Sequence, residues 1–225
     1  MFVSRSMTRK VVTIGKDADI LDAQEKMVEN RIRHLPVVEG KDCLIGVVTD
    51  RDIRSALPYS MFKESNYGKA REKMISLTVG DIMTENPFSI SPMDTIQDAL
   101  LLIDLKRVGA FPVVDENGKL VGIISVRDLL RAFANVLGLG EPGTLICILV
   151  EEKIGQLKKI VDIITEEKIG FGSVLVARYW DEGKRAVFPY LLTSNVSRVK
   201  RRLKDMGYTL LDPMQWALDE LPEDD

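Results

Sequence analysis

Side chains suited to metal binding and covalent catalysis are scarce in this sequence of 225 residues. It contains two cysteines, Cys43 and Cys147, and one histidine, His34. Zinc sites take Cys and His ligands at short, regular spacings, whereas these three residues are scattered. A Ser-His-Asp or Cys-His catalytic unit would depend on His34 alone. Because a P-loop and a G-x-S-x-G motif are missing as well, the sequence favours a protein that is not an enzyme and holds no metal.

Long apolar runs are also missing. The longest are about five or six residues, as at 99–103 and 145–150, whereas a membrane-spanning helix needs about 20. Residues 1–10 carry basic side chains without an apolar segment behind them, unlike a secretory signal. We therefore expect a cytoplasmic protein with no membrane partner.

An excess of positive charge is absent too. Lys and Arg number 31 and Asp and Glu 34, for a net charge of -3. Without net basicity or a clear helix-turn-helix pattern, a nucleic-acid partner is not expected. Hydrophobic residues make up 45% and charged residues 29%, which is typical of a soluble globular protein.

What the sequence does contain is an internal repeat. Residues 7–56 align without a gap with residues 83–132, at an offset of 76 positions. The identical pairs include Met7-Thr8 with Met83-Thr84, Ile20 with Ile96, Asp22-Ala23 with Asp98-Ala99, Arg31 with Arg107, Pro36-Val37-Val38 with Pro112-Val113-Val114, Leu44 with Leu120, Gly46 with Gly122, and Arg51-Asp52 with Arg127-Asp128.

Each copy has the pattern of a β-α-β-β-α unit. A short β-branched stretch, at 11–14 or 88–90, leads to a capping residue, Asp19 or Thr95, and an amphipathic helix. Two apolar strands joined by a turn of Gly, Asp and Asn residues follow, at 35–48 and 111–124. A second helix opens at Thr49 or Ser125. Both copies of the repeat are therefore expected to have the same fold.

The Met-Thr openings, the H-L-P-V-V segment from His34 and the G-V-V-T-D-R-D segment from Gly46 resemble those of tandem CBS domains. The resemblance covers about residues 1–135. It implies a pair of units whose clefts bind AMP, ADP, ATP or S-adenosylmethionine as a regulatory ligand, with no cofactor required, and report it to a partner.

The candidate nucleotide site centres on Thr49, Arg51 and Asp52. A hydroxyl at a helix start, together with the free N–H groups of the first turn, suits a phosphate, and a carboxylate can accept hydrogen bonds from ribose hydroxyls. Arg51, Arg33 and His34 are the expected cationic groups. The same Thr-x-x-Asp pattern is also a helix capping box that needs no ligand, and His34 could be an ordinary partly buried histidine.

The predicted site residues occupy equivalent positions in the two copies. They are Thr13, Arg33, His34, Leu35, Pro36, Thr49, Arg51 and Asp52 in the first copy, and Ser89, Ala110, Phe111, Pro112, Ser125, Arg127 and Asp128 in the second. Because Gly109 and Ala110 replace the Arg-His pair of the first copy, we expect the first cleft to bind phosphates better.

The first helix of the second copy is apolar around more than one face, with the run 99–103 followed by Leu105. Such a helix needs burial on more than one side. Tandem CBS domains often pair through these helices, so we expect a homodimer with this helix at the contact. A thicker core within one chain is the alternative. The segment at 61–80, between the copies, is expected to be a partly helical linker.

The last third of the chain reads as a separate module. Residues 138–143 contain three glycines and a proline, which is typical of a linker. The pattern then gives β-α-β-β-α-β over 144–213, the ferredoxin-like order, and leaves 214–225 as a tail. The two copies of the repeat are placed at 1–60 and 81–137. The predicted fold class of the whole chain is mixed α/β.

The segment from Val150 to Leu157 resembles the first strand-to-helix turn of ACT domains, with Ile154 and Gly155 where that family often has Pro-Gly. The resemblance implies a possible amino acid ligand at this turn, although Gly155 could merely start the helix. It also implies sheet pairing between chains. The architecture resembles the acetoin-utilisation type of regulatory protein, and predicts an adenine-nucleotide sensor. The alternatives are an S-adenosylmethionine sensor and a dimerisation or interaction module that binds no ligand.

Overall fold

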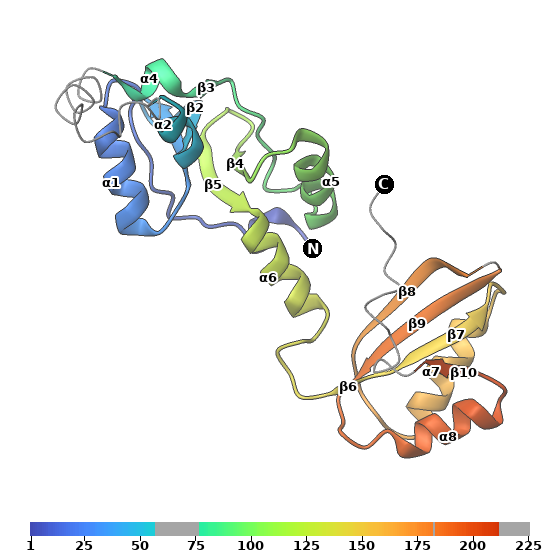
Figure 1. Cartoon of the computed structure of the whole chain (residues 1–225). Coiled ribbons are helices and arrows are strands. Elements are labelled where there is room, and N and C mark those ends of the chain that lie inside the picture. Colours follow the sequence, from blue (N-terminus) through green and yellow to red (C-terminus); the bar gives the residue numbers. More distant parts are fainter. Residues whose placement is uncertain (57–76, 182, 212–225) are drawn as a thin grey trace, which may run out of the picture. The chain divides into compact units, whose positions relative to one another are not determined.

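The computed structural model describes residues 1–56, 77–181 and 183–211. These residues form two compact units, Met1–Leu130 and Arg131–Asp225, here called unit 1 and unit 2. Unit 1 contains the repeat, and unit 2 contains the last third of the chain (Figure 1). The division falls inside a helix. The predicted linker segment lies mostly outside the described residues.

The two copies have the same elements in the same order, as the repeat predicts. The first copy contains α1 (Ile20–Asn30), β1 (His34–Glu39), β2 (Cys43–Thr49) and α2 (Asp50–Ala56). The second contains α5 (Ile96–Lys106), β4 (Ala110–Val114), β5 (Leu120–Ser125) and α6 (Val126–Val136). β1 pairs antiparallel with β2 and β4 with β5, and each pair has one register shift at the same repeat position.

The expected helix starts are confirmed. Asp19 precedes α1, and its side chain accepts a hydrogen bond from the Asp22 N–H. Thr95 precedes α5 and forms a capping box with Asp98. The apolar positions at i and i+3 of both helices are buried. These short local patterns therefore place both helices correctly.

The expected strands at 11–14 and 88–90 are mostly wrong. Only Ile14 and Ile90 form a bridge, each parallel to the first strand of its hairpin. Gly15 follows the first, and Ser91-Pro92 follows the second. The chain therefore turns toward the helix after one residue in register, so β-branched residues alone do not make a strand here.

Each Met-Thr segment was predicted to open the copy that follows it, but it pairs with a strand of the other copy. β3 (Thr84–Glu85) pairs with β2 of the first copy. Thr8 exchanges two hydrogen bonds with Ile123 of β5, at 2.9 and 3.0 Å. The short helices that precede them, η1 (Val3–Arg5) and α4 (Val79–Ile82), follow the same exchange: Val3 N–H donates to Asp94 O and Val79 N–H to Ala18 O, both at 2.8 Å.

Two glycines make room for this exchange. A Cβ atom built on Gly46 would lie 2.5 Å from Sδ of Met83, and one on Gly122 would lie 2.5 Å from Sδ of Met7. Each methionine thus packs directly against a glycine of the other copy's hairpin. The repeated Met and Gly are therefore partners in packing.

Unit 2 has the predicted element order. β6 (Thr144–Leu145) and β7 (Cys147–Glu151) lead to α7 (Gln156–Glu166), then β8 (Phe171–Asp181), β9 (Lys184–Leu191), α8 (Ser197–Asp205) and β10 (Thr209–Leu211). The antiparallel sheet has the order β10-β7-β9-β8, with β6 also beside β9. One apolar core joins β7 and β9 to α7 and α8; Figure 1 shows both helices on one side of the sheet.

The glycine-rich segment at 138–143 and the residue before it, Leu137, contact the rest of unit 2. Ser173 Oγ donates to Leu137 O at 2.9 Å, and Tyr190 Oη donates to Glu141 O at 2.6 Å. A Cβ on Gly138 would lie 3.1 Å from the Gly172 backbone. In the described part of the chain, no helix has the length and apolar character to cross a bilayer.

Candidate functional site

The Thr49 to Asp52 segment forms the turn from β2 into α2. Oδ2 of Asp52 accepts hydrogen bonds from the Thr49 N–H at 2.8 Å and from Thr49 Oγ1 at 2.7 Å. The Asp52 N–H donates back to Thr49 Oγ1 at 3.3 Å. This is the capping box expected from the sequence. Both hydrogen bonds to the carboxylate use one oxygen, so the capping role involves only part of that group.

The second copy repeats this geometry. Oδ2 of Asp128 accepts from the Ser125 N–H at 2.9 Å and from Ser125 Oγ at 2.7 Å. The strand that faces each turn also matches: His34 pairs with Thr49 and Ala110 with Ser125. Each predicted Thr/Ser and Asp pair therefore lies at the end of a hairpin, beside the residue that precedes the buried Leu-Pro or Phe-Pro dipeptide.

The remaining predicted residues divide into backbone and side-chain contributors. Leu35, Pro36, Phe111 and Pro112 are buried and directly follow the strand residues that pair with the two turns. The carbonyl groups of the two prolines accept hydrogen bonds from the Ile14 and Ile90 N–H groups at 3.2 and 3.1 Å. This places Thr13 and Ser89, the preceding residues, beside the first strand of each hairpin. Arg51 and Arg127 are exposed on the first turns of α2 and α6.

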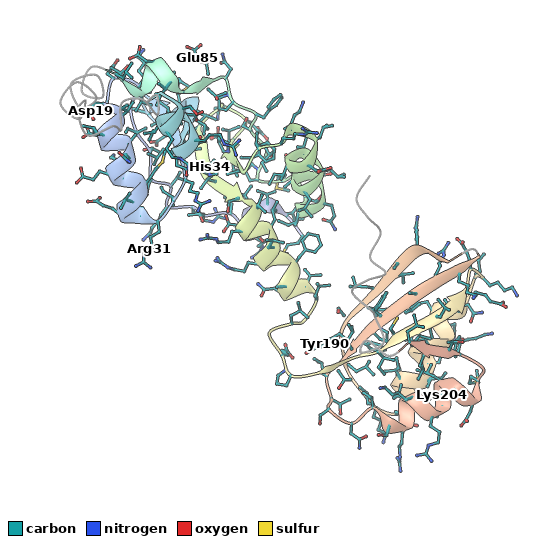
Figure 2. All side chains as sticks on the ribbon, viewed as in Figure 1. Asp19, Arg31, His34, Glu85, Tyr190 and Lys204 are labelled. Atoms are coloured by element: carbon teal, nitrogen blue, oxygen red, sulfur yellow. The ribbon has the colours of Figure 1, made fainter. Side chains whose placement is uncertain are left out.

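His34 lies where the two copies meet (Figure 2). A Cβ on Gly109 would lie 2.8 Å from Nε2 and 2.9 Å from Cε1 of His34. The imidazole ring thus lies next to Gly109, the residue of the second copy that is equivalent to Arg33. Burial lowers the pKa of His34 below its ordinary value, while the carboxylates of Asp50 and Asp52 act in the opposite direction. The half-buried ring is therefore mostly neutral near pH 7.

A cleft of about 580 Å³ brings together predicted residues from both copies. Arg33 of the first copy and Arg127 of the second both line it. It lies between α1 and α2, and its other lining residues are Gln24, Met27, Val28, Arg31, Ile32, Asp50, Ile53 and Arg54. Arg51 and His34 are not among them. The cleft therefore adjoins the Thr49 turn without including all of the expected cationic groups.

Sequence reasoning missed Arg31 and Arg54 as possible site residues. Arg31 ends α1 with a left-handed backbone (φ 54°), a conformation in which Gly or Asn is more usual. Its repetition as Arg107 was visible in the sequence but gave no sign of a cleft. Arg54 donates to the Asp50 carboxylate at 3.0 Å, an i,i+4 spacing that the sequence could have suggested.

The turn predicted to hold an amino acid in unit 2 is open. Ile154 is fully exposed, and nothing lies within 4 Å of a Cβ built on Gly155, whose φ is +91° and which precedes α7. A separate pocket of about 340 Å³ lies nearby, between β7, β10 and the start of α7. Tyr208 Oη there donates to Gln156 Oε1 at 2.8 Å. Gly155 thus directly precedes α7 with a left-handed backbone. Within the described ranges no cluster of metal ligands is found.

Comparison with known proteins identifies the repeat. The CBS domain family model matches residues 3–59 and 79–135. A CBS domain-containing protein of Dictyostelium discoideum is 33% identical over 137 residues, covering 61% of this chain and 94% of that protein. The homoserine O-acetyltransferase of Methanococcoides burtonii is 35% identical over 129 residues, which cover 57% of this chain but only 23% of the enzyme. The acetyltransferase activity therefore does not transfer with this match.

Solved structures of CBS pairs resemble the chain over the same region. CBSX2 of Arabidopsis thaliana in complex with AMP has a TM-score of 0.51 and 28% identity, covering 60% of this chain and 97% of that one. The CBS pair of protein MJ0100, in complex with 5'-methylthioadenosine and S-adenosylmethionine, has a TM-score of 0.50 and 25% identity, with coverages of 60% and 96%.

A Vibrio cholerae protein assigned to acetoin utilization, AcuB, has a TM-score of 0.52 and 26% identity, covering 63% of this chain and 98% of that one. The family model alone accounts for half of the present chain and matches both copies of the repeat. The chain belongs to the CBS domain family.

Proposed function

We propose that this chain is a regulatory protein without catalytic activity of its own, which binds an adenine nucleotide in the clefts of its CBS pair. The observation that carries the proposal is the pair of Thr/Ser and Asp turns, which have the same hydrogen bonds at the same repeat positions. Relatives of this fold bind AMP or S-adenosylmethionine. AMP, ADP and ATP are the ligands expected here, and no cofactor is required.

In this proposal each turn has two roles. Oδ2 of Asp52 caps α2, and the second carboxylate oxygen accepts hydrogen bonds from the ribose hydroxyls. The N–H groups at the start of α2 and the nearby Arg33 and Arg51 bind phosphate. Thr13, Leu35 and Pro36 form the adjoining wall. Asp128, Ser125 and Arg127 have the same roles in the second cleft, with Ser89, Ala110, Phe111 and Pro112.

The two clefts are not expected to bind equally. The second has Gly109 and Ala110 in place of Arg33 and His34, and Val126 in place of Asp50. Of these residues only Arg33 is a positively charged donor, because His34 is mostly neutral near pH 7 and Asp50 is acidic, so the loss of Arg33 removes charge-assisted hydrogen bonds to phosphate. The first cleft should therefore be the stronger phosphate site, and the second suits a less charged nucleoside, as in an S-adenosylmethionine sensor.

Unit 2 is the proposed output module. Its element order and the sheet order β10-β7-β9-β8 support a ferredoxin-like, ACT-like domain. Ligand binding would change the packing of the CBS pair and so alter this domain or a partner protein, which requires different affinities for two states. A possible amino acid ligand at Ile154 and Gly155 remains part of the hypothesis, as does a cytoplasmic location.

A homodimer is proposed on the surface of α5. Leu101 and Leu105 are 71% and 73% exposed, which contradicts the alternative of a thicker core within unit 1. Exposed leucines on one helix are suited to a contact between chains. The ACT-like sheet could form a second contact. The proposed boundaries are those expected from the sequence, with copies at 1–60 and 81–137, linkers at 61–80 and 138–143, the ACT-like domain at 144–213 and a tail at 214–225.

A melting experiment tests the proposed function. A ligand that binds only the folded state raises the melting temperature, so the chain is heated with AMP, ADP, ATP, S-adenosylmethionine and a panel of amino acids. We expect stabilisation by an adenine nucleotide. Calorimetry on Asp52→Ala and Asp128→Ala then assigns the clefts, and loss of all binding in Asp128→Ala alone would contradict the stronger first cleft. No shift with any ligand would favour the interaction module.

A further inference from the structure

Four arginines line the cleft between α1 and α2. Arg31 and Arg33 come from the segment after α1, Arg54 from α2 and Arg127 from the first turn of α6. Asp50 is the one acidic residue in the lining, and it is paired with Arg54. The cleft therefore has a clear positive charge, although the chain as a whole has a net charge of -3.

The cleft begins next to the Thr49 turn. Arg33 directly precedes His34, which pairs with Thr49, and the Asp50 N–H donates to the Arg33 carbonyl at 3.1 Å. Asp50, which lines the cleft, lies two residues before Asp52, the proposed ribose acceptor. The apolar side chains of Met27, Ile32 and Ile53 contribute to the lining, whereas the four arginines are exposed and so are accessible to an anion from solvent.

We propose that this cleft holds the phosphate chain of the nucleotide, so that the first CBS copy prefers adenosine di- and triphosphates over the monophosphate. This inference rests on the proposed function and names the ligand class of that site. Arginine suits the role because its planar guanidinium binds phosphate oxygens in a bidentate manner. The volume of about 580 Å³ lies within the roughly 300–1,000 Å³ of small-molecule sites.

The second copy does not reproduce this set. Gly109 stands for Arg33, Val126 for Asp50 and Leu130 for Arg54, and only Arg107 matches Arg31. Arg107 ends α5 with nearly the same left-handed backbone, φ 52° against 54°, and it is not a lining residue of the cleft. A substitution at Arg107 therefore reproduces the local backbone effect of the same substitution at Arg31 without touching the cleft.

Titration calorimetry with the full chain tests the proposal, using AMP, ADP, ATP and inorganic tripolyphosphate at fixed salt. For the wild type we expect ATP to bind about tenfold more tightly than AMP, as one or more additional charge-assisted hydrogen bonds would give. Tripolyphosphate should compete with ATP. Arg31→Gln should remove most of the preference for ATP by weakening ATP binding far more than AMP binding, whereas Arg107→Gln should change neither.

Each failure has a distinct meaning. Equal affinities for AMP and ATP in the wild type would overturn the phosphate-chain proposal while leaving the proposed function intact. An equal loss of AMP and ATP binding in Arg31→Gln would also overturn it, since that pattern indicates a structural role. If no nucleotide binds, the proposed function fails; tripolyphosphate binding that depends on Arg31 would then still support an anion site here, and its absence would overturn that site as well.

Discussion

The two CBS copies have the same backbone and different surfaces. The helix caps, the hairpin register shifts and the Met-Gly contacts recur at equivalent positions. The exposed positions diverge: Arg33-His34 of the first copy becomes Gly109-Ala110, whereas Glu25 and Glu29 become Leu101 and Leu105. Residues that determine the fold are thus retained, whereas the exposed positions differ, and the proposals above assign a charged ligand to the first copy and an apolar contact to the second.

The largest expected effect concerns the apolar contact. Replacing Leu101 and Leu105 with Glu gives α5 the residues of α1 and should weaken the proposed dimer at least about 100-fold, because each buried Leu contributes about 1.5–3 kcal/mol and the two-fold axis doubles the count. Light scattering on the wild type and the double variant measures this. Glu25→Gln with Glu29→Gln is the matched control, and a monomeric wild type would remove the contact from the comparison.

Next come the glycines at the exchanged segments. Gly46→Ala and Gly122→Ala should each lower the free energy of unfolding by about 1–3 kcal/mol, since the new Cβ would overlap a methionine Sδ. Denaturant unfolding measures both. Gly15→Ala, where nothing lies within 4 Å, should have little effect. Unequal losses at Gly46 and Gly122 would show that the two exchanges differ in strength.

Smaller losses are expected at the capping boxes. Asp52→Ala and Asp128→Ala each remove two hydrogen bonds from a helix start, which should cost about 1 kcal/mol of unfolding free energy in either copy. Chemical denaturation without nucleotide provides the values. Similar losses with unequal effects on nucleotide binding would separate the shared structural role from the divergent ligand role. A much larger loss at one position would contradict equal capping.

The smallest effect should be the pH dependence at His34. Because its pKa in the folded chain lies below the ordinary value, the unfolded chain binds the proton first as pH falls. The stability contributed by neutral His34 is therefore present above about pH 6.5 and decreases as pH falls from there toward the lower folded pKa. Comparing the unfolding free energies of wild type and His34→Ala between about pH 5 and 7.5 isolates this slope, because alanine does not titrate. The variant carries the residue that the second copy has at the equivalent position, Ala110. Identical slopes would contradict the prediction.

The sequence predicted the parts of this fold that depend on near neighbours. Asp19 and Thr95 mark helix starts, and the turns at 39–42 and 115–118 mark hairpins, because capping and turn chemistry act within about four residues. The Thr49 and Ser125 turns were visible for the same reason. The repeat added what no single motif could, since each copy supported the reading of the other.

Long-range pairing was not visible. The repeat alignment correctly matched Met7 with Met83. Sequence order assigned each methionine to the copy that follows it in the chain. The hydrogen bonds of Thr8 and the pairing of Thr84 instead join each Met-Thr segment to the other copy. The sequence also did not predict the arginine cleft, because Arg127 lies far from Arg31 in the chain although both line the cleft. The contact of His34 with Gly109 depends on how the two copies face each other, which no local pattern records.

The exchanged segments mean that neither copy is complete as a continuous piece of chain. Cutting the chain between the copies would leave each half carrying the other's sheet edge and helix-start partner. Two separate single-copy chains could complete each other only by meeting, at a rate and extent set by their concentration. Joining them on one polypeptide replaces that encounter with a fixed effective concentration, so the paired clefts remain assembled however dilute the protein becomes.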